Sequence, residues 1–259
     1  MELSTSFFDP ALLETEYFRR HRDAYAKYFV EGLIPKYRCY PIFIDALQTV
    51  FSYNARHGLS FSGRLKNQWR DLRACDGIIA EVIVYAHYAT LVDRGTIRSL
   101  DIRKDDYDLK IERANGSEAF LEILSVNPEF RKTPTGCYEV MSHKQEGPAS
   151  IRQKLLKKMR LQKQMQKARE NWAVIELNNV TIAGDFAVRS SLSSGYKLQF
   201  NRDSMEVEQR GYDWNWSIFD EPETRHLHGV IHFDLGLYED RRYILNERVR
   251  GEGEKPDVP

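Results

Sequence analysis

Apolar positions recur at helical spacing through the first 75 residues of the chain. Asp9-Pro10 suits the start of a helix, and apolar side chains such as Leu13, Tyr17 and Phe18 follow at intervals of one turn. After a break at 32–41, the same periodicity predicts a second helix over 42–54 and a third over 65–73. We therefore expect a helical N-terminal region at residues 1–75.

The pattern changes at Asp76. An uninterrupted apolar stretch over 78–92 contains three alanines and predicts a helix that Asp76 caps and Gly95 ends, although its β-branched residues leave a strand open. Shorter apolar runs then predict strands over 96–103, 106–113 and 119–126, the last two joined by a turn at Asn115-Gly116. A long loop is expected over 127–148.

A second helix of this part is predicted from Ser150, which forms a capping-box pattern with Gln153, to Glu170. Residues 172–177 then predict a buried strand, and further strands are expected over 186–188, 196–200, 229–233 and 243–245. The order predicts an α/β fold over 76–250 with a mixed central sheet flanked by helices. The charged, Gly- and Pro-containing residues 251–259 predict a disordered tail.

Composition and charge exclude several classes of protein. Three widely spaced cysteines without a C-x-x-C pair argue against a disulfide framework and a thiolate zinc site. No apolar run reaches the roughly 18 residues of a membrane span, and the first residues lack a signal-peptide pattern, so we expect a cytoplasmic protein without a membrane partner. Nucleotide-binding glycine loops, zinc-protease and serine-hydrolase motifs are also lacking.

Three acidic residues stand in apolar surroundings. Glu81 is the only charge in its apolar helix, and Asp108 and Glu122 lie on consecutive strands, where two carboxylates together could bind Mg²⁺. A two-residue turn at Asn115-Gly116 would send Asp108 and Glu122 to opposite faces, whereas a three-residue turn would bring them to one face. One alternative is a solvated or structurally paired Glu81. The other is that Asp105, Asp106 and Asp108 are solubility residues at a strand edge and that Glu122 pairs with Lys110.

Positive charge is concentrated in the helix predicted over 150–170. Eight basic residues stand there against one acid, Glu170, although the net charge of the chain is zero. Such a row can neutralise phosphates, and the alternative is a solvated helix face. The candidate nucleic-acid-binding residues are Arg152, Lys157, Lys158, Arg160 and Lys163, and Ile151, Leu155, Met159, Gln162 and Met165 form the expected buried stripe.

The acid in the first helix of the core, the aspartate and glutamate on consecutive strands and the basic helix that follows resemble the PD-(D/E)XK nuclease-like superfamily in order and spacing. The resemblance covers 76–180 and implies Mg²⁺ or Mn²⁺ held by Asp108 and Glu122, with Glu81 assisting. The family lysine, two residues after the strand glutamate, is replaced by Leu124. Lys110 and Lys154 are the candidates for that cation.

We therefore expect a metal-dependent endonuclease that acts on DNA, with Glu81, Asp108, Glu122, Lys110 and Lys154 as catalytic residues. The alternative is an inactive protein of the same fold that binds nucleic acid or serves as an assembly module. DNA is the expected partner, and a second copy of the chain is a further candidate.

Overall fold

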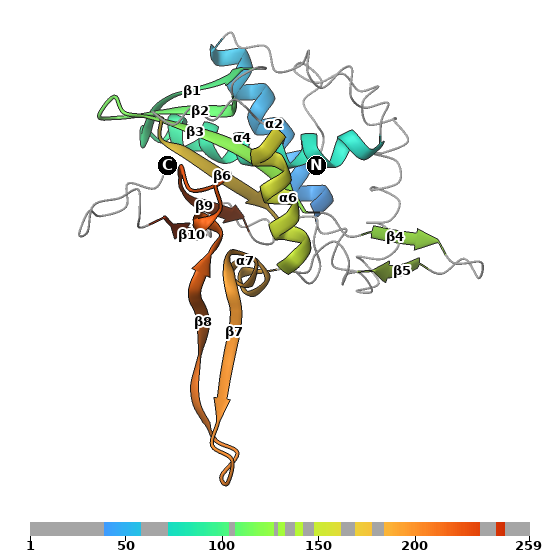
Figure 1. Ribbon diagram of the computed structural model, residues 1–259. Coiled ribbons are helices and arrows are strands. Elements are labelled where there is room, and N and C mark those ends of the chain that lie inside the picture. The colour runs from blue at the N-terminus through green and yellow to red at the C-terminus, as the bar shows by residue number, and fades with distance from the viewer. Residues whose placement is uncertain are drawn as a thin grey trace.

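A six-stranded mixed sheet forms the centre of the computed structural model (Figure 1), which describes residues 39–57, 72–103, 107–126, 129–132, 138–141, 148–161, 169–177, 184–233 and 242–246. The strand order is β1-β2-β3-β6-β9-β10. The strands are β1 (Ile97–Arg103), β2 (Tyr107–Arg113), β3 (Glu118–Ser125), β6 (Asn171–Glu176), β9 (Leu227–Phe233) and β10 (Arg242–Leu245).

Parallel pairing is confined to the middle of this sheet. β3 and β6, and β6 and β9, run parallel, whereas β1, β2 and β3 form an antiparallel meander and β10 pairs antiparallel with β9. Every residue of β6 is buried, as expected for a parallel strand with both faces covered. The predicted α/β fold with a mixed sheet is thus confirmed.

Helices cover both faces of the sheet. On one face α4 (Leu72–Asp93) packs against alternate residues such as Leu121, Ile123 and Val174, and α2 (Cys39–His57) packs against α4. On the other face α6 (Pro148–Leu161) and α7 (Asp185–Leu192) cover Leu124 and Ile175. Side chains of a strand alternate between faces, so the two apolar sets form two cores separated by the sheet. No helix in the described part of the chain is long and apolar enough to cross a membrane.

The end of α4 fits its sequence. Gly95 adopts a left-handed conformation with φ of 70°, its N–H donates to Val92 O at 2.9 Å, and the N–H of Thr96 donates to Leu91 O at 2.9 Å. This pair of bonds is the Schellman pattern that glycine favours after a helix. The start differs from expectation, because the helix begins at Leu72 and Asp76 lies inside it.

Several predicted elements are corrected by the structure. The expected loop at 127–148 contains the short hairpin β4 (Glu129–Lys132) and β5 (Tyr138–Met141), and the expected strand at 186–188 lies in α7, where Val188 and Leu192 are one turn apart and buried. α6 begins at Pro148, which suits a first turn, so Ser150 is not its cap. The remaining elements are β7 (Ser193–Phe200), β8 (Val207–Ser217) and a 3₁₀ turn, η4 (Ile218–Asp220).

Some predictions fall on residues outside the described ranges. These are the helix after Asp9-Pro10, most of the helix at 65–73, the tail at 251–259, and the part of the basic helix that holds Gln162, Lys163 and Met165. Glu170, expected to end that helix, lies outside helical structure immediately before β6.

Candidate functional site

The turn between β2 and β3 has three residues, which decides where the two carboxylates point. Arg113 N–H donates to Ser117 O at 2.9 Å, leaving residues 114–116 as the loop, and Gly116 adopts the left-handed conformation with φ of 83°. Glycine is favoured there because a left-handed residue closes the three-residue hairpin. Leu109 lies opposite Leu121 in the resulting register, so Asp108 and Glu122 lie on one face of the sheet.

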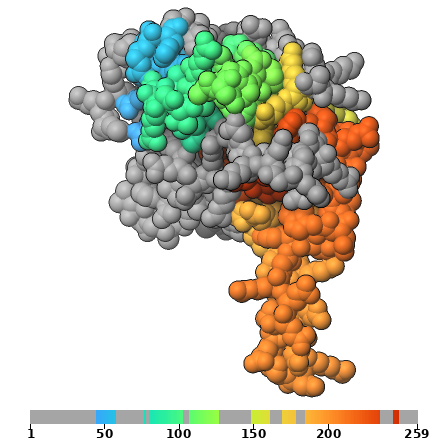
Figure 2. All heavy atoms as spheres, turned by 90° about the vertical axis from the view of Figure 1, so that its left-hand side faces the viewer, coloured from blue at the N-terminus to red at the C-terminus, as the bar shows by residue number. Residues whose placement is uncertain are grey.

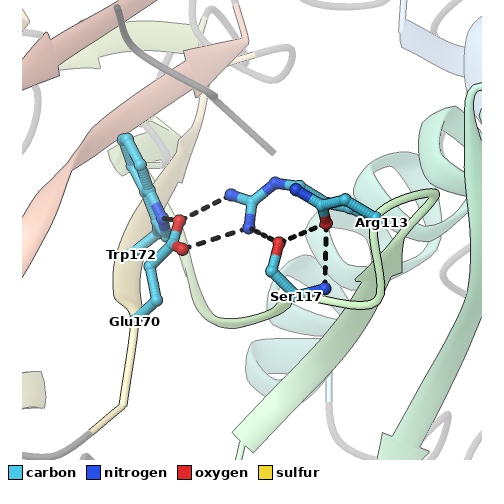
Figure 3. Close-up of polar contacts among 5 residues, drawn as sticks. Arg113, Ser117, Glu170 and Trp172 are labelled. Carbon is cyan, nitrogen blue, oxygen red and sulfur yellow. Dashed lines mark hydrogen bonds and ion pairs between the residues drawn. The ribbon is translucent and has the colours of Figure 1, made fainter. Parts of the chain in front are cut away.

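A partly buried ion pair holds this turn against the neighbouring strand (Figure 3). The two guanidinium nitrogens of Arg113 donate to the two carboxylate oxygens of Glu170 at 2.5 and 3.0 Å, and the indole of Trp172 donates to the same carboxylate at 2.8 Å. Arg113 also donates to the hydroxyl of Ser117 at 3.1 Å. The bidentate contact fixes orientation as well as distance, so it stabilises the register that places Asp108 beside Glu122.

Lys158 of α6 lies between the two carboxylates. Its ammonium is 2.9 Å from Asp108 Oδ2 and 2.9 Å from Glu122 Oε1, and it also donates to the carbonyl oxygen of Ile123. Asp108 is held from a second direction by the N–H of Ile123, at 2.8 Å. Three oxygens from β2 and β3 therefore converge on one positive charge that a helix supplies across the sheet face.

Burial makes these charges depend on one another. The side chain of Glu122 is 1% exposed and that of Asp108 is 9% exposed. Burial, reinforced by the charge of Asp108 and opposed by Lys158, raises the pKa of Glu122 to about 8. Burial also acts to raise the pKa of Asp108, but Lys158 and the Ile123 N–H outweigh it and hold this pKa below its ordinary value. The Lys158 ammonium thus offsets the burial of the Asp108 carboxylate fully and that of the Glu122 carboxylate only in part.

A pocket of about 350 Å³ adjoins Lys158. It is lined by Glu81 from α4, by the end of β3 and by three lysines of α6, namely Lys154, Lys157 and Lys158. Glu81 is half-buried and faces this pocket. In the part of the chain that the structure describes, no three acidic, histidine or cysteine side chains form a metal-binding group.

The predicted positions of the positive charges need correction. Lys110 shares a strand face with Asp108 but pairs with Glu118 at 3.0 Å, and Lys154 lines the pocket, so the cation at the carboxylates is Lys158. The alternative in which Glu122 pairs with Lys110 is wrong, because Glu122 pairs with Lys158.

Lys158 was expected to contact phosphate, and its spacing in the helix explains why it lies at the carboxylates instead. It lies seven residues after Ile151 and three after Leu155, both of which are buried, so it borders the buried stripe of the helix. A lysine at such a position must bring a partner for its charge into the core. This spacing is the sequence signal that could have identified it.

The other basic residues of α6 divide into two groups. The Arg152 guanidinium donates to the carbonyl oxygens of Ser191 and Ser193 at 2.8 and 2.6 Å and lies over the ring of Trp216, so it joins α6 to α7 and β7. We therefore remove Arg152 from the phosphate-contacting set. Lys157 and Arg160 remain exposed, and Arg160 pairs with Glu223 at 2.8 Å. Lys163 lies outside the described ranges.

Comparisons with known proteins supply no family for this chain. Neither protein-family models, nor curated proteins, nor solved structures give a match. The function must therefore be argued from the site itself.

Proposed function

We propose that the chain is a divalent-metal-dependent phosphodiesterase that acts on DNA, with Asp108 and Glu122 as the metal-binding carboxylates and Lys158 as the catalytic lysine. The observation that carries this proposal is the position of the Lys158 ammonium, held by Asp108, Glu122 and the Ile123 carbonyl beside a lysine-lined pocket.

The donor set fits Mg²⁺ or Mn²⁺. These ions take oxygen ligands, and Mg²⁺ is commonly bound by one or two carboxylates together with water and substrate phosphate. Two carboxylates and one carbonyl converge here, and once Glu122 has lost its proton the two carboxylate charges exceed that of one ammonium. The ammonium and a divalent ion cannot occupy the same point, so Lys158 must turn from the carboxylates when a metal ion binds.

The pocket gives the displaced ammonium a place to act. Lys158 already forms part of the pocket wall with Lys154 and Lys157, and a phosphate between these lysines would be bound by charge without reading sequence. A divalent cation at the carboxylates would activate water and polarise the phosphate. Lys158 would then stabilise negative charge that develops on the phosphate, and the Ile123 N–H would keep Asp108 oriented. Glu81 would hold a water in the pocket by accepting a hydrogen bond from it.

DNA is the proposed polymer because α6 presents exposed basic residues both at the pocket and beyond it. Lys157 and Arg160 are exposed, and Lys163 follows them in the sequence. Several adjacent phosphates would be neutralised by such a row, with affinity that falls steeply as salt concentration rises. The other candidate partner, a second copy of the chain, concerns a different surface of the molecule.

A cleavage assay tests the proposed activity. We expect the wild type to nick or cleave duplex, branched or single-stranded DNA with Mg²⁺ or Mn²⁺, and Glu122→Gln to lower the rate at least about a hundredfold because the cation loses a charged ligand. Glu118→Gln is the matched control, since Glu118 lies on the same strand and pairs with Lys110 at the surface. A wild type that binds DNA but cleaves none of these substrates would contradict the proposal.

One observation favours a second function, that of a non-catalytic DNA-binding protein. Lys158 itself neutralises part of the carboxylate charge, so the folded chain has no physical requirement for a metal ion. In that case salt-sensitive DNA binding through Lys157 and Arg160 would persist in Glu122→Gln, in Lys158→Met and in the presence of a chelator. Loss of DNA binding on removal of divalent ions would contradict this second function.

A further inference from the structure

The strands β7 and β8 form a hairpin that projects from the body of the protein (Figures 1 and 2). They pair only with each other, in a two-stranded sheet separate from the central one. A two-stranded ribbon in water is marginally stable, because neither face is covered by a core. A surface that covered one face of this projecting hairpin would therefore stabilise it.

Exposed apolar side chains are concentrated on this hairpin and the helix before it. Of the eight large hydrophobic side chains that are exposed in the described part of the chain, seven lie between residues 186 and 214. They are Phe186, Tyr196, Leu198, Phe200, Met205, Val207 and Trp214. Scattered exposed hydrophobic residues are ordinary, but a cluster of this kind marks an interaction site.

The apolar side chains share one face of the hairpin. Tyr196, Leu198 and Phe200 alternate along β7, and Tyr196 lies opposite Tyr212 on β8. Leu198 lies opposite Arg210, so this face also carries one basic side chain among the apolar ones. The rings of Tyr196 and Tyr212 are 5.1 Å apart, and Phe186 of α7 lies 5.4 Å from Tyr196. Trp214 lies two residues from Tyr212 on the same face, at 6.3 Å between rings.

The opposite face of the hairpin is polar. Lys197, whose strand neighbours point to the apolar face, pairs with Asp213 at 2.6 Å, and Gln199 lies opposite Gln209. The projecting hairpin is therefore amphipathic across its two faces.

The charge of the hairpin decides the kind of partner. Residues 193–217 hold three basic side chains (Lys197, Arg202 and Arg210) against four acidic ones (Asp203, Glu206, Glu208 and Asp213). A surface that binds nucleic acid or an anionic membrane needs an excess of positive charge, which this hairpin lacks. An apolar face with nearly balanced charge fits another protein surface of the same character.

The apolar area is sufficient for a pair of identical hairpins. From their exposed fractions, the six residues other than Met205 at the tip present about 600 Å² in all, backbone and polar atoms included, so two copies packed face to face would bury at most about 1,200 Å², against the roughly 1,000 Å² of a specific interface. A twofold axis brings the same patch of both copies together and covers both at once. We propose that the apolar face of the β7–β8 hairpin is the interface of a homodimer.

Sedimentation of the full-length chain tests this interface. We expect the wild type to be a dimer at micromolar concentration, and the double variant Leu198→Arg with Phe200→Arg to shift the dissociation constant at least a hundredfold toward monomer, since four buried charges would face each other across the axis. The control is Gln199→Arg, which adds one arginine on the polar face of the same strand and should remain a dimer.

Each result has a defined meaning. Circular dichroism must show that the double variant keeps its secondary structure. The double variant should also bind Mn²⁺ as the wild type does, because the carboxylates lie on a different part of the fold. A wild type that sediments as a monomer at tens of micromolar would overturn the proposal. A double variant that dimerises as tightly as the wild type would also overturn it, because the interface would then lie elsewhere.

Discussion

Replacing Lys158 by Met should destabilise the protein by about 3–5 kcal/mol near pH 8 when a chelator is present, which is the usual cost of removing one partner from a buried ion pair. The ammonium of Lys158 is the only charge that the structure shows against both Asp108 and Glu122 among the described residues. The neutral side chain of methionine has a similar length, so the packing changes little. Equilibrium denaturation of wild type and variant would measure the difference.

Divalent ions should reverse this loss. In Lys158→Met the two carboxylates no longer have an ammonium to compete with a metal ion, so Mn²⁺ should raise the melting temperature of the variant more than that of the wild type. Lys157→Met is the control, because Lys157 is the next residue of α6 and is exposed. Its stability should remain within about 0.5 kcal/mol of wild type. Equal stabilities of Lys158→Met and wild type in chelator would contradict the ion-pair account.

The two isosteric carboxylate substitutions should change stability in opposite directions. Asp108 is held in its ionised form by Lys158 and the Ile123 N–H, so Asp108→Asn should cost about 2 kcal/mol at pH 8. Glu122 has its pKa raised from 4.5 to about 8, so its charge opposes folding, and Glu122→Gln should be more stable than wild type at pH 8 in chelator.

The pH dependence follows from the same pKa shifts. Between about pH 4.5 and 8 the folded wild type holds a proton on Glu122 that the unfolded chain has lost, so stability falls as pH rises, by up to about 1.4 kcal/mol per pH unit. Glu122→Gln has no carboxyl group to titrate here, so the difference between its free energy of unfolding and that of the wild type should grow from pH 5 to pH 8. The Asp108 contribution is present above pH 3.8 and is lost as pH falls through its lowered folded pKa.

Glu118→Gln serves as the control for both carboxylate substitutions, since its surface pair with Lys110 contributes little. Its stability should follow that of wild type at every pH. A Glu122→Gln variant with the pH profile of the wild type would show that Glu122 is ionised throughout, against the expectation from its burial.

The sequence predicts the central elements of the fold because their patterns are local. The apolar run that forms α4, the meander of β1 to β3 and the buried strand β6 each have the periodicity of their structure. The hairpin β4–β5 was missed because its strands have only four residues each, and α7 was missed because only residues 186–188 of its eight were considered, a segment short enough to fit a strand or a helix. β8 was missed because its first half holds three consecutive polar residues, Glu208 to Arg210, although Tyr212, Trp214 and Trp216 alternate with polar residues in its second half.

The site was predicted in part for a similar reason. Side chains alternate between the two faces of a strand, so Asp108 and Glu122 share a face only if the turn has three residues. The three-residue turn is held by the long-range contact between Arg113 and Glu170. Lys158 comes from a different segment, and its contact with the carboxylates depends on how α6 crosses the sheet. Such a placement is tertiary, and only the spacing of Lys158 from Ile151 and Leu155 hints at it in the sequence.

Titration of the wild type and Glu122→Gln with Mn²⁺, followed by electron paramagnetic resonance of the free ion, tests the central claim most directly. At pH 8, where Glu122 can lose its proton, we predict that the wild type binds one more ion per chain than Glu122→Gln, and that Glu118→Gln binds as the wild type does. Equal Mn²⁺ binding by the wild type and Glu122→Gln would contradict the claim that Asp108 and Glu122 form a metal site.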